Sequence, residues 1–429
     1  MKKILVLILA IVFVFTLAAC NGNDSGSGGA ATPTPAAGDG GPHANADGSV
    51  NLNDVAFYDR DFDYTKNGPF KLKYLTLDNS PLYDDFNSGY EHWSSLMNIQ
   101  FDGMWSCLYD NDLMLQQIQT CADQGYDAII IDPDTTTYPA IIEVLKANPQ
   151  LNWIAGMAGP RDTGDPDEPK IYPSIGFDFF ECGQLQMEWL MNYAQKEWPG
   201  TPLEEIGIVV VDFSVVQALH DREVGLRNYY FKNGGIEENF ITLDGVSGSM
   251  DADTARNLAM PVVSTNTKFT HWLAAGVFDD YSVGLAAAFD ALGLNDKACV
   301  TVMGGSTLIR QWDAGQDTAW RSAYFTQQNI YAEPILGALY AFMSGYATPE
   351  NIWPKWIDVN DHGREGDTYA SLLLPGYWLE KDTYKNYLAW SDMYASSSLY
   401  PYPQEGISLD DFSARADVPD YYSVVGPRQ

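Results

Sequence analysis

The stretch 125–134 constrains the fold of this chain more than any other. It reads Gly-Tyr-Asp-Ala-Ile-Ile-Ile-Asp-Pro-Asp, and the four apolar residues 128–131 leave no polar face. Such a strand is typically covered by helices on both sides, as in a parallel sheet. Asp132 and Pro133 end it, because a residue before proline avoids the helical region and proline cannot donate to a ladder. Open α/β sheets bind ligands in polar loops at the carboxyl ends of their strands.

The first twenty residues have the pattern of an export signal. Lys2 and Lys3 precede an apolar run, and Leu-Ala-Ala stands directly before Cys20. An uncleaved membrane helix is the alternative, but the run is short for a span, so we predict a signal peptide over residues 1–19. The last residues resemble the lipobox of bacterial lipoproteins, which implies that Cys20 is acylated. Residues 21–50, rich in Gly, Ala, Ser, Pro and Asp, predict a flexible tether.

The mature chain is long enough to form two lobes, and its negative charge argues against nucleic-acid binding. About 370 residues are too many for one ordinary core. The formal net charge is −33, whereas phosphate binding needs clustered Lys and Arg. Besides Cys20 there are four cysteines, without a CxxC pair or a cysteine–histidine cluster. We expect buried free thiols, and a Cys107–Cys121 disulfide is the alternative in an exported chain.

Strand and helix patterns alternate along most of the chain. In the first half we expect strands at 71–77, 99–105, 128–131 and 151–157, with helices at 86–97, 113–122 and 138–147, the second capped by Asn111 or Asp112. The pattern repeats with strands at 206–211, 240–243, 271–278 and 298–303 and helices at 217–230 and 284–291. This alternation predicts βαβ units with parallel sheets. Two similar α/β halves imply a cleft between them.

Five motifs, in this order, resemble those of the type I periplasmic binding proteins for sugars, the solute receptors of ABC transporters. Residues 127–133 are similar to the family's Asp-Ala-Ile-Ile-x-x-Pro, and 175–183 to its Asp-Asn-x-x-x-Gly crossover. Arg-x-x-Gly-Leu at 222–226, Phe-Asp-Asp at 278–280 and Tyr-Phe-Thr-Gln at 324–327 match the other three. The resemblance implies two Rossmann-like lobes with parallel sheets, joined by a three-strand hinge.

The resemblance also divides the chain. It implies crossings between lobes near 175–178, 326–328 and 374–376, the last a strand ending in Pro-Gly before a helix at 381–390. The expected N-terminal lobe is 68–176 plus 328–374, and the C-terminal lobe is 177–327 plus 375–390. Residues 20–67 form the lipid-anchored tether and lead-in, and 391–429 a C-terminal tail beyond the family pattern. Short crossing strands are hinge candidates because they absorb dihedral change when lobes close.

A sugar needs aromatic rings for its C–H faces and polar side chains for its hydroxyls. The family's positions imply six ligand-binding residues here. Each has a structural alternative: Asn79 as a turn residue, Tyr83 as a surface-loop tyrosine and Asp178 as a helix N-cap, for example. Arg222, two positions after His220, is expected to pair with a carboxylate. The six candidates are Asn79, Tyr83, Asp178, His220, Asp279 and Gln327.

Three departures from the family pattern bear on the ligand. The family's Asp-Arg after the fourth strand is absent, Met-Gly-Gly-Ser at 303–306 replaces its Gly-Phe-Asp loop, and Asp279 replaces an asparagine. These differences argue against ribose.

The sequence predicts a non-enzymatic, lipid-anchored receptor outside the cytoplasm that delivers a small sugar or polyol to an ABC permease. We expect a monomer without cofactor, metal or catalytic residues. No nucleophile elbow, Walker loop or His-Glu-x-x-His motif is present, and the acidic stretch 162–168 lacks the spacing of a calcium loop. The alternatives are a sensor that feeds a chemoreceptor or histidine kinase, a non-sugar ligand such as a nucleoside, and a glycoside-hydrolysing enzyme.

Overall fold

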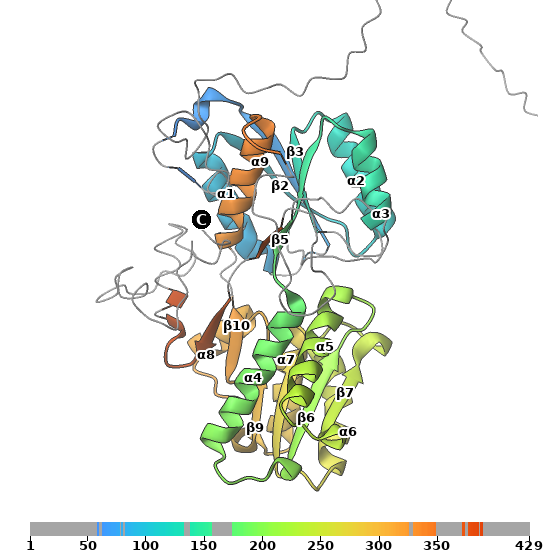
Figure 1. Cartoon of the computed structure of the whole chain (residues 1–429), viewed down its shortest axis with the longest axis vertical. Helices are drawn as coiled ribbons and strands as arrows, with labels where there is room; N and C mark the ends of the chain where they lie inside the picture. The colour runs from blue at the N-terminus through green and yellow to red at the C-terminus, as the bar shows by residue number, and fades with distance from the viewer. Residues whose placement is uncertain are drawn as a thin grey trace, which may run out of the picture. The chain divides into compact units, whose positions relative to one another are not determined.

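A computed structural model describes most of the expected two-lobe region. It covers residues 58–59, 62–77, 79, 82–132, 138–156, 174–325, 329–348, 371–373, 376–385 and 387–388. Within them the chain forms two parallel sheets with helices packed on them (Figure 1). The predicted fold class, an α/β chain with two parallel-sheet lobes, is confirmed. Among the described residues no helix is both long and apolar enough to span a bilayer.

The first sheet has six parallel strands in the order β11-β5-β4-β3-β1-β2. β3 lies at its centre with all four residues fully buried, and successive residues point into two different cores. The expectation of helices on both faces is therefore correct. The strands are β1 (Phe70–Thr76), β2 (Ile99–Ser106), β3 (Ala128–Ile131), β4 (Asn152–Ala155), β5 (Ser174–Gly176) and β11 (Ser371–Leu373); the helices are α1 (Leu82–Leu96), α2 (Asn111–Asp123), α3 (Tyr138–Ala147) and α9 (Asn329–Met343).

The second sheet has four parallel strands in the order β7-β6-β8-β9. Its strands are β6 (Ile206–Asp212), β7 (Phe240–Asp244), β8 (His271–Gly276) and β9 (Ala298–Thr301), and its helices are α4 (Phe179–Glu197), α5 (Gln217–Lys232), α6 (Ala252–Thr265), α7 (Asp279–Ala291) and α8 (Ser306–Asp313). Helices α4 and α5 pack closely at Gly183 and Gly225. A Cβ on Gly225 would lie 2.0 Å from the Phe180 carbonyl oxygen, and one on Gly183 would lie 2.1 Å from the Arg222 carbonyl oxygen.

A two-stranded antiparallel sheet pairs β10 (Ser322–Phe325) with β12 (Tyr377–Glu380). The strand predicted to end at Pro-Gly corresponds to β11, whereas the sequence predicts no strand over 377–380. Tyr377 and Leu379 are buried while Glu380 is exposed, and this alternation is typical of a half-buried strand. Of the described residues that follow, only 384–385 and 387–388 are helical.

Two other details of the helix starts differ from the prediction. Asp110, not Asn111 or Asp112, caps α2, because its Oδ1 accepts the Leu113 N–H at 2.9 Å. Helix α1 begins at Leu82, one turn before the predicted start. Short 3₁₀ turns stand before or after several strands: Tyr64–Lys66, Leu203–Glu205, Glu237–Asn239, Gly245–Ser247 and Asn295–Lys297.

The described part of the lead-in packs on α9. The Tyr58 N–H donates to Glu333 Oε1 at 3.2 Å, and the Tyr340 hydroxyl donates to the Tyr64 carbonyl at 3.0 Å. The rings of Tyr64 and Tyr340 meet edge to face. Residues 58–59 and 62–67 are thus a docked segment, even though they lie next to the predicted tether.

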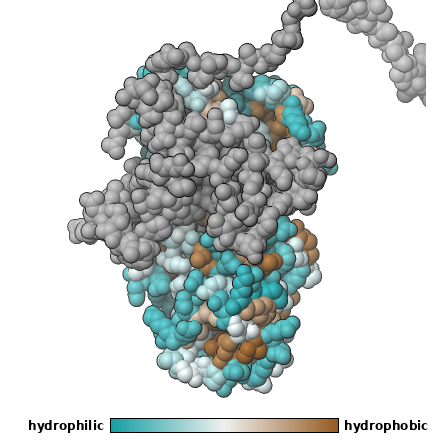
Figure 2. Space-filling model, in the orientation of Figure 1, coloured by the Kyte–Doolittle hydropathy of each residue, from teal (hydrophilic) through white to brown (hydrophobic). Residues whose placement is uncertain are grey.

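The four cysteines after Cys20 lie inside the protein, and the described surface in Figure 2 is mostly hydrophilic. Cys107, Cys121, Cys182 and Cys299 are all free and buried, so the expectation of buried thiols is confirmed. Figure 2 shows hydrophilic side chains over most of the described surface on that face, with smaller apolar patches between them.

Candidate functional site

Polar side chains gather where the strands of each parallel sheet end. In the first sheet these are Asp132, directly after β3, and Tyr74 on the neighbouring strand β1. The Tyr74 hydroxyl lies 2.9 and 3.0 Å from the two carboxylate oxygens, and the Tyr83 hydroxyl donates to Oδ2 at 2.6 Å. We call these three residues the tyrosine–aspartate cluster. Its carboxylate is buried, so the two hydroxyls supply hydrogen bonds that water would otherwise give.

A glycine lets the next strand end beside this cluster. A Cβ on Gly156, directly after β4, would lie 3.0 Å from Asp132 Oδ1 and 3.1 Å from the Tyr74 hydroxyl oxygen. Burial, with the Asp132 charge adding to it, raises the pKa of Tyr74 well above its ordinary value. Tyr74 is therefore a permanent donor to the carboxylate.

Sequence reasoning chose Tyr83 but used Asp132 only to end a strand. The structure places Tyr83 in the first turn of α1 rather than in a surface loop. The residue is 9% exposed, and its ring is edge-on to that of Tyr74. Asn79, on the preceding loop, is exposed. The available signal for Asp132 was its position after the most buried strand.

In the second sheet His220 pairs with Asp212. Asp212 is the last residue of β6 and is 2% exposed, while His220 lies in the first turn of α5 with its side chain 36% exposed. The distance from His220 Nδ1 to Asp212 Oδ2 is 2.7 Å, and the other carboxylate oxygen accepts the Phe213 N–H at 2.7 Å. Burial raises the pKa of Asp212, and the hydrogen bond from His220 opposes that rise.

Glu223, one helical turn beyond His220, brings a third possible metal ligand to this place. The ligand atoms of Asp212, His220 and Glu223 all lie within 4.8 Å of one another. However, Glu223 Oε1 already accepts hydrogen bonds from Arg227, at 2.6 and 3.0 Å, and from the Thr242 hydroxyl. Ion pairing and hydrogen bonding therefore account for this arrangement without a cation.

Arg222 lies buried at the same end of the sheet. Its Nη1 donates to the carbonyl oxygens of Val277 and Met303, which follow β8 and β9, and its guanidinium stacks 4.9 Å from the Phe179 ring. Burial lowers its pKa. The expected carboxylate partner is not found among the described residues, so this prediction is wrong within them. Arg222 instead ties two strand ends to α4.

Asp279, the first residue of α7, holds the loop between β9 and α8. Its Oδ1 accepts the Gly305 N–H at 2.7 Å and its Oδ2 accepts the Thr307 N–H at 2.9 Å. Burial raises the pKa of Asp279, and these two bonds oppose the rise. Gly304 has φ +130°, and a Cβ there would lie 2.5 Å from Asp279 Oδ1, so the glycine allows this approach. The sequence did not reveal this loop-holding role.

Two ligand-binding candidates remain, Asp178 and Gln327, together with the predicted acylation site Cys20. Asp178 follows β5 and caps α4, accepting the Glu181 N–H at 2.9 Å, as the N-cap alternative predicted. Beside it, the Phe177 ring lies 5.7 Å from the ring of Tyr331 on α9. Gln327 and Cys20 lie outside the described residues.

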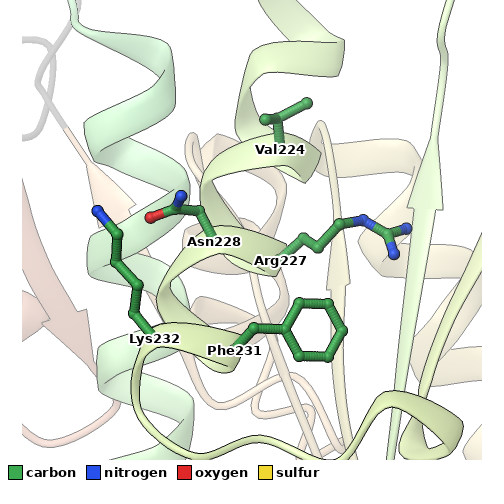
Figure 3. A pocket seen from close by; sticks show the side chains of 5 residues that line it. All are labelled: Val224, Arg227, Asn228, Phe231 and Lys232. Carbon is green, nitrogen blue, oxygen red and sulfur yellow. The ribbon is translucent and has the colours of Figure 1, made fainter. Parts of the chain in front are cut away.

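A shallow pocket lies elsewhere, on α5 (Figure 3). Its lining side chains come from this single helix, beyond the first turn that carries His220: Val224, Arg227, Asn228, Phe231 and Lys232. Because the carboxyl end of β6 leads into the start of α5, this pocket is not at the sheet edge. We do not assign it to the candidate site.

Comparison with known proteins gives a family and a fold. The family model described as a periplasmic binding protein domain matches residues 106–330. An ABC transporter periplasmic solute binding protein from Actinobacillus succinogenes, solved with D-allose, has a TM-score of 0.58 at 13% identity, over 74% of this chain and 100% of that one. No curated protein sequence matches this chain.

Two further solved structures have the same fold. An ABC transporter solute binding protein from Bacillus halodurans, solved with myo-inositol, has a TM-score of 0.56 at 14% identity over 75% of this chain and 98% of that one. Another, from Agrobacterium vitis, was solved with α-D-tagatopyranose and has a TM-score of 0.54 at 17% identity, over 73% and 95% of the two chains. At these identities the similarity establishes a shared fold.

Proposed function

The chain belongs to the periplasmic binding protein domain family, and we propose that it is a receptor for a small sugar or polyol of an ABC transporter. The family works outside the cytoplasm. In this proposal the ligand binds at the carboxyl ends of the strands and is released unchanged to a permease. The chain acts as a monomer, held at the membrane by a lipid on Cys20.

One observation carries the proposal: hydrogen-bonding side chains gather at the carboxyl ends of both parallel sheets. Asp132, Asp212 and Asp279 all lie there, together with Tyr83 and His220. Each carboxylate oxygen can accept more than one hydrogen bond, so the internal bonds leave acceptor capacity for ligand hydroxyls. Open α/β sheets bind their ligands at this edge.

The solved structures support the ligand class. D-allose, myo-inositol and tagatose, with which they were solved, share several hydroxyls and no charge. We propose that the six positions chosen from the sequence contact such a ligand, namely Asn79, Tyr83, Asp178, His220, Asp279 and Gln327. A sensor feeding a chemoreceptor or kinase would use the same site, and a nucleoside is the alternative ligand.

Thermal-shift screening tests this function. The purified protein is heated with pentoses, hexoses, polyols, disaccharides and nucleosides. A ligand that binds only the folded state adds about 2.7 kcal/mol of stability at a hundredfold excess over Kd. We expect at least one sugar or polyol to raise the melting temperature, and less so in the His220→Gln variant. A hit among nucleosides alone would contradict the ligand class, and a panel without a hit would contradict the function.

A further inference from the structure

We propose that Asp212 is a positioning residue that fixes the tautomer of His220 and so makes the site select a hydroxyl donor. This inference rests on the proposed function, because it takes His220 as a ligand contact. The tautomer decides which nitrogen of the ring can accept a hydrogen bond from the ligand.

The geometry assigns the proton on the inner nitrogen. Asp212 Oδ2 lies 2.7 Å from His220 Nδ1. An ionised carboxylate only accepts hydrogen bonds, so Nδ1 must carry the hydrogen in both the neutral and the cationic ring. In the neutral ring the outer nitrogen, Nε2, is then a bare acceptor.

Asp212 is held firmly enough to act as an orienting group. It ends a central strand, it is 2% exposed, and its second oxygen accepts the Phe213 N–H. Its partner, by contrast, has a side chain that is 36% exposed. Among the described residues, the bond to Asp212 is the one hydrogen bond that the imidazole ring of His220 makes. The buried carboxylate therefore holds the ring at Nδ1, and Nε2 has no protein partner among the described residues.

The surrounding charges do not compete for Nδ1. Glu223 is neutralised by Arg227, with Oε1 to Nη2 at 2.6 Å. Asp244, at the end of the neighbouring strand β7, accepts the Ser214 hydroxyl at 2.6 Å and the Val246 N–H at 3.0 Å. Asp212 is therefore the carboxylate that sets the tautomer.

The chemical consequence is a preference at one position of the ligand. A bare Nε2 accepts a hydrogen bond from a hydroxyl, but it offers nothing to an ether or a carbonyl oxygen. A sugar or polyol with a free hydroxyl at that position should bind better than its O-methyl analogue. The difference expected for one neutral hydrogen bond is about three- to tenfold in Kd.

Nitrogen NMR of histidine-labelled protein tests the tautomer without any ligand. The chain has five histidines, and the signal missing from His220→Gln identifies His220. We expect a protonated Nδ1 and, when the ring is neutral, an unprotonated Nε2. Asp212→Asn should remove this preference, whereas the matched control Asp244→Asn removes a neighbouring charge and should leave it unchanged. A neutral ring protonated at Nε2, or equal effects of the two variants, would overturn the assignment.

Ligand binding then separates this inference from the function it rests on. With a ligand found by screening, Asp212→Asn should weaken binding about three- to tenfold, and Asp244→Asn should not. If the tautomer changes while affinity does not, the positioning role is wrong although the receptor function stands. If no sugar or polyol binds the unaltered protein, the function fails while the NMR result on the ring is unaffected.

Discussion

Tyr74 and Tyr90 are both fully buried tyrosines on adjacent elements, but their hydroxyls differ. Tyr74 donates to Asp132, whereas the Tyr90 hydroxyl has no hydrogen-bond partner among the described residues. Tyr74→Phe removes a donor to a buried carboxylate and should lower the free energy of unfolding by about 1.5–3 kcal/mol. Tyr90→Phe, the matched control, should leave it unchanged or raise it slightly. Chemical denaturation measures both, and equal effects would show that the cluster is not a stabilising network.

Asp279 is expected to stabilise the protein through the loop that it holds. Asp279→Ala leaves the N–H groups of Gly305 and Thr307 without their acceptor, which should cost about 1.5–3 kcal/mol of unfolding free energy. Asp280→Ala is the control, because it removes an exposed carboxylate from the same turn of α7 and should change stability by less than about 0.5 kcal/mol. If the two variants unfold at the same denaturant concentration, Asp279 does not hold the loop.

At the scale of elements, the buried carboxyl of Glu333 on α9 makes the stability of the folded chain depend on pH. Burial raises the pKa of Glu333 to about 7, while the Tyr58 N–H opposes the rise. The folded state therefore binds the proton more tightly than the unfolded state. The resulting stability is fully present below the unfolded pKa, near 4.5, and is lost as pH rises through about 7.

The measurement for this element compares unfolding free energies at pH 5 and pH 8. The contribution of Glu333 to the free energy of unfolding should fall by roughly 2–3 kcal/mol between pH 5 and pH 8. Glu333→Gln should remove this part of the pH dependence. Glu143→Gln, an exposed position on α3, should retain it. A pH profile for Glu333→Gln that parallels the unaltered protein would contradict the shifted pKa.

The sequence predicted elements well where the deciding signal was local. The apolar run of β3 and the helix α3 match their predicted bounds. The sequence does not predict β12, because the strand β10 with which it pairs lies about fifty residues earlier in the chain. The cap of α2 was missed by one residue because three adjacent Asx residues offer the same chemistry.

The site was less predictable, because its contacts join residues far apart in the chain. His220 was chosen from its position in a motif, but nothing local indicated that Asp212 would hold its ring. Asp132 meets Tyr74 across 58 positions, through strand order that only the folded sheet reveals. Motif positions thus identified candidate ligand-binding residues, whereas only the fold shows which residues form hydrogen bonds with them.

At the scale of the whole molecule, the two parallel sheets bring similar chemistry to their carboxyl ends by different residues. The first sheet presents a carboxylate between tyrosines, and the second a carboxylate beside a histidine. Both arrangements suit hydroxyl groups, which donate and accept hydrogen bonds. The proposed receptor function therefore requires that a polyhydroxylated molecule binds reversibly and is released unchanged.

Calorimetric titration of the purified protein with the strongest sugar or polyol from the screen tests this requirement most directly. We predict a saturable isotherm with one ligand per chain, and full recovery of the unmodified ligand afterwards. Heat that never saturates for any sugar or polyol, or a ligand recovered as a hydrolysed product, would contradict the account.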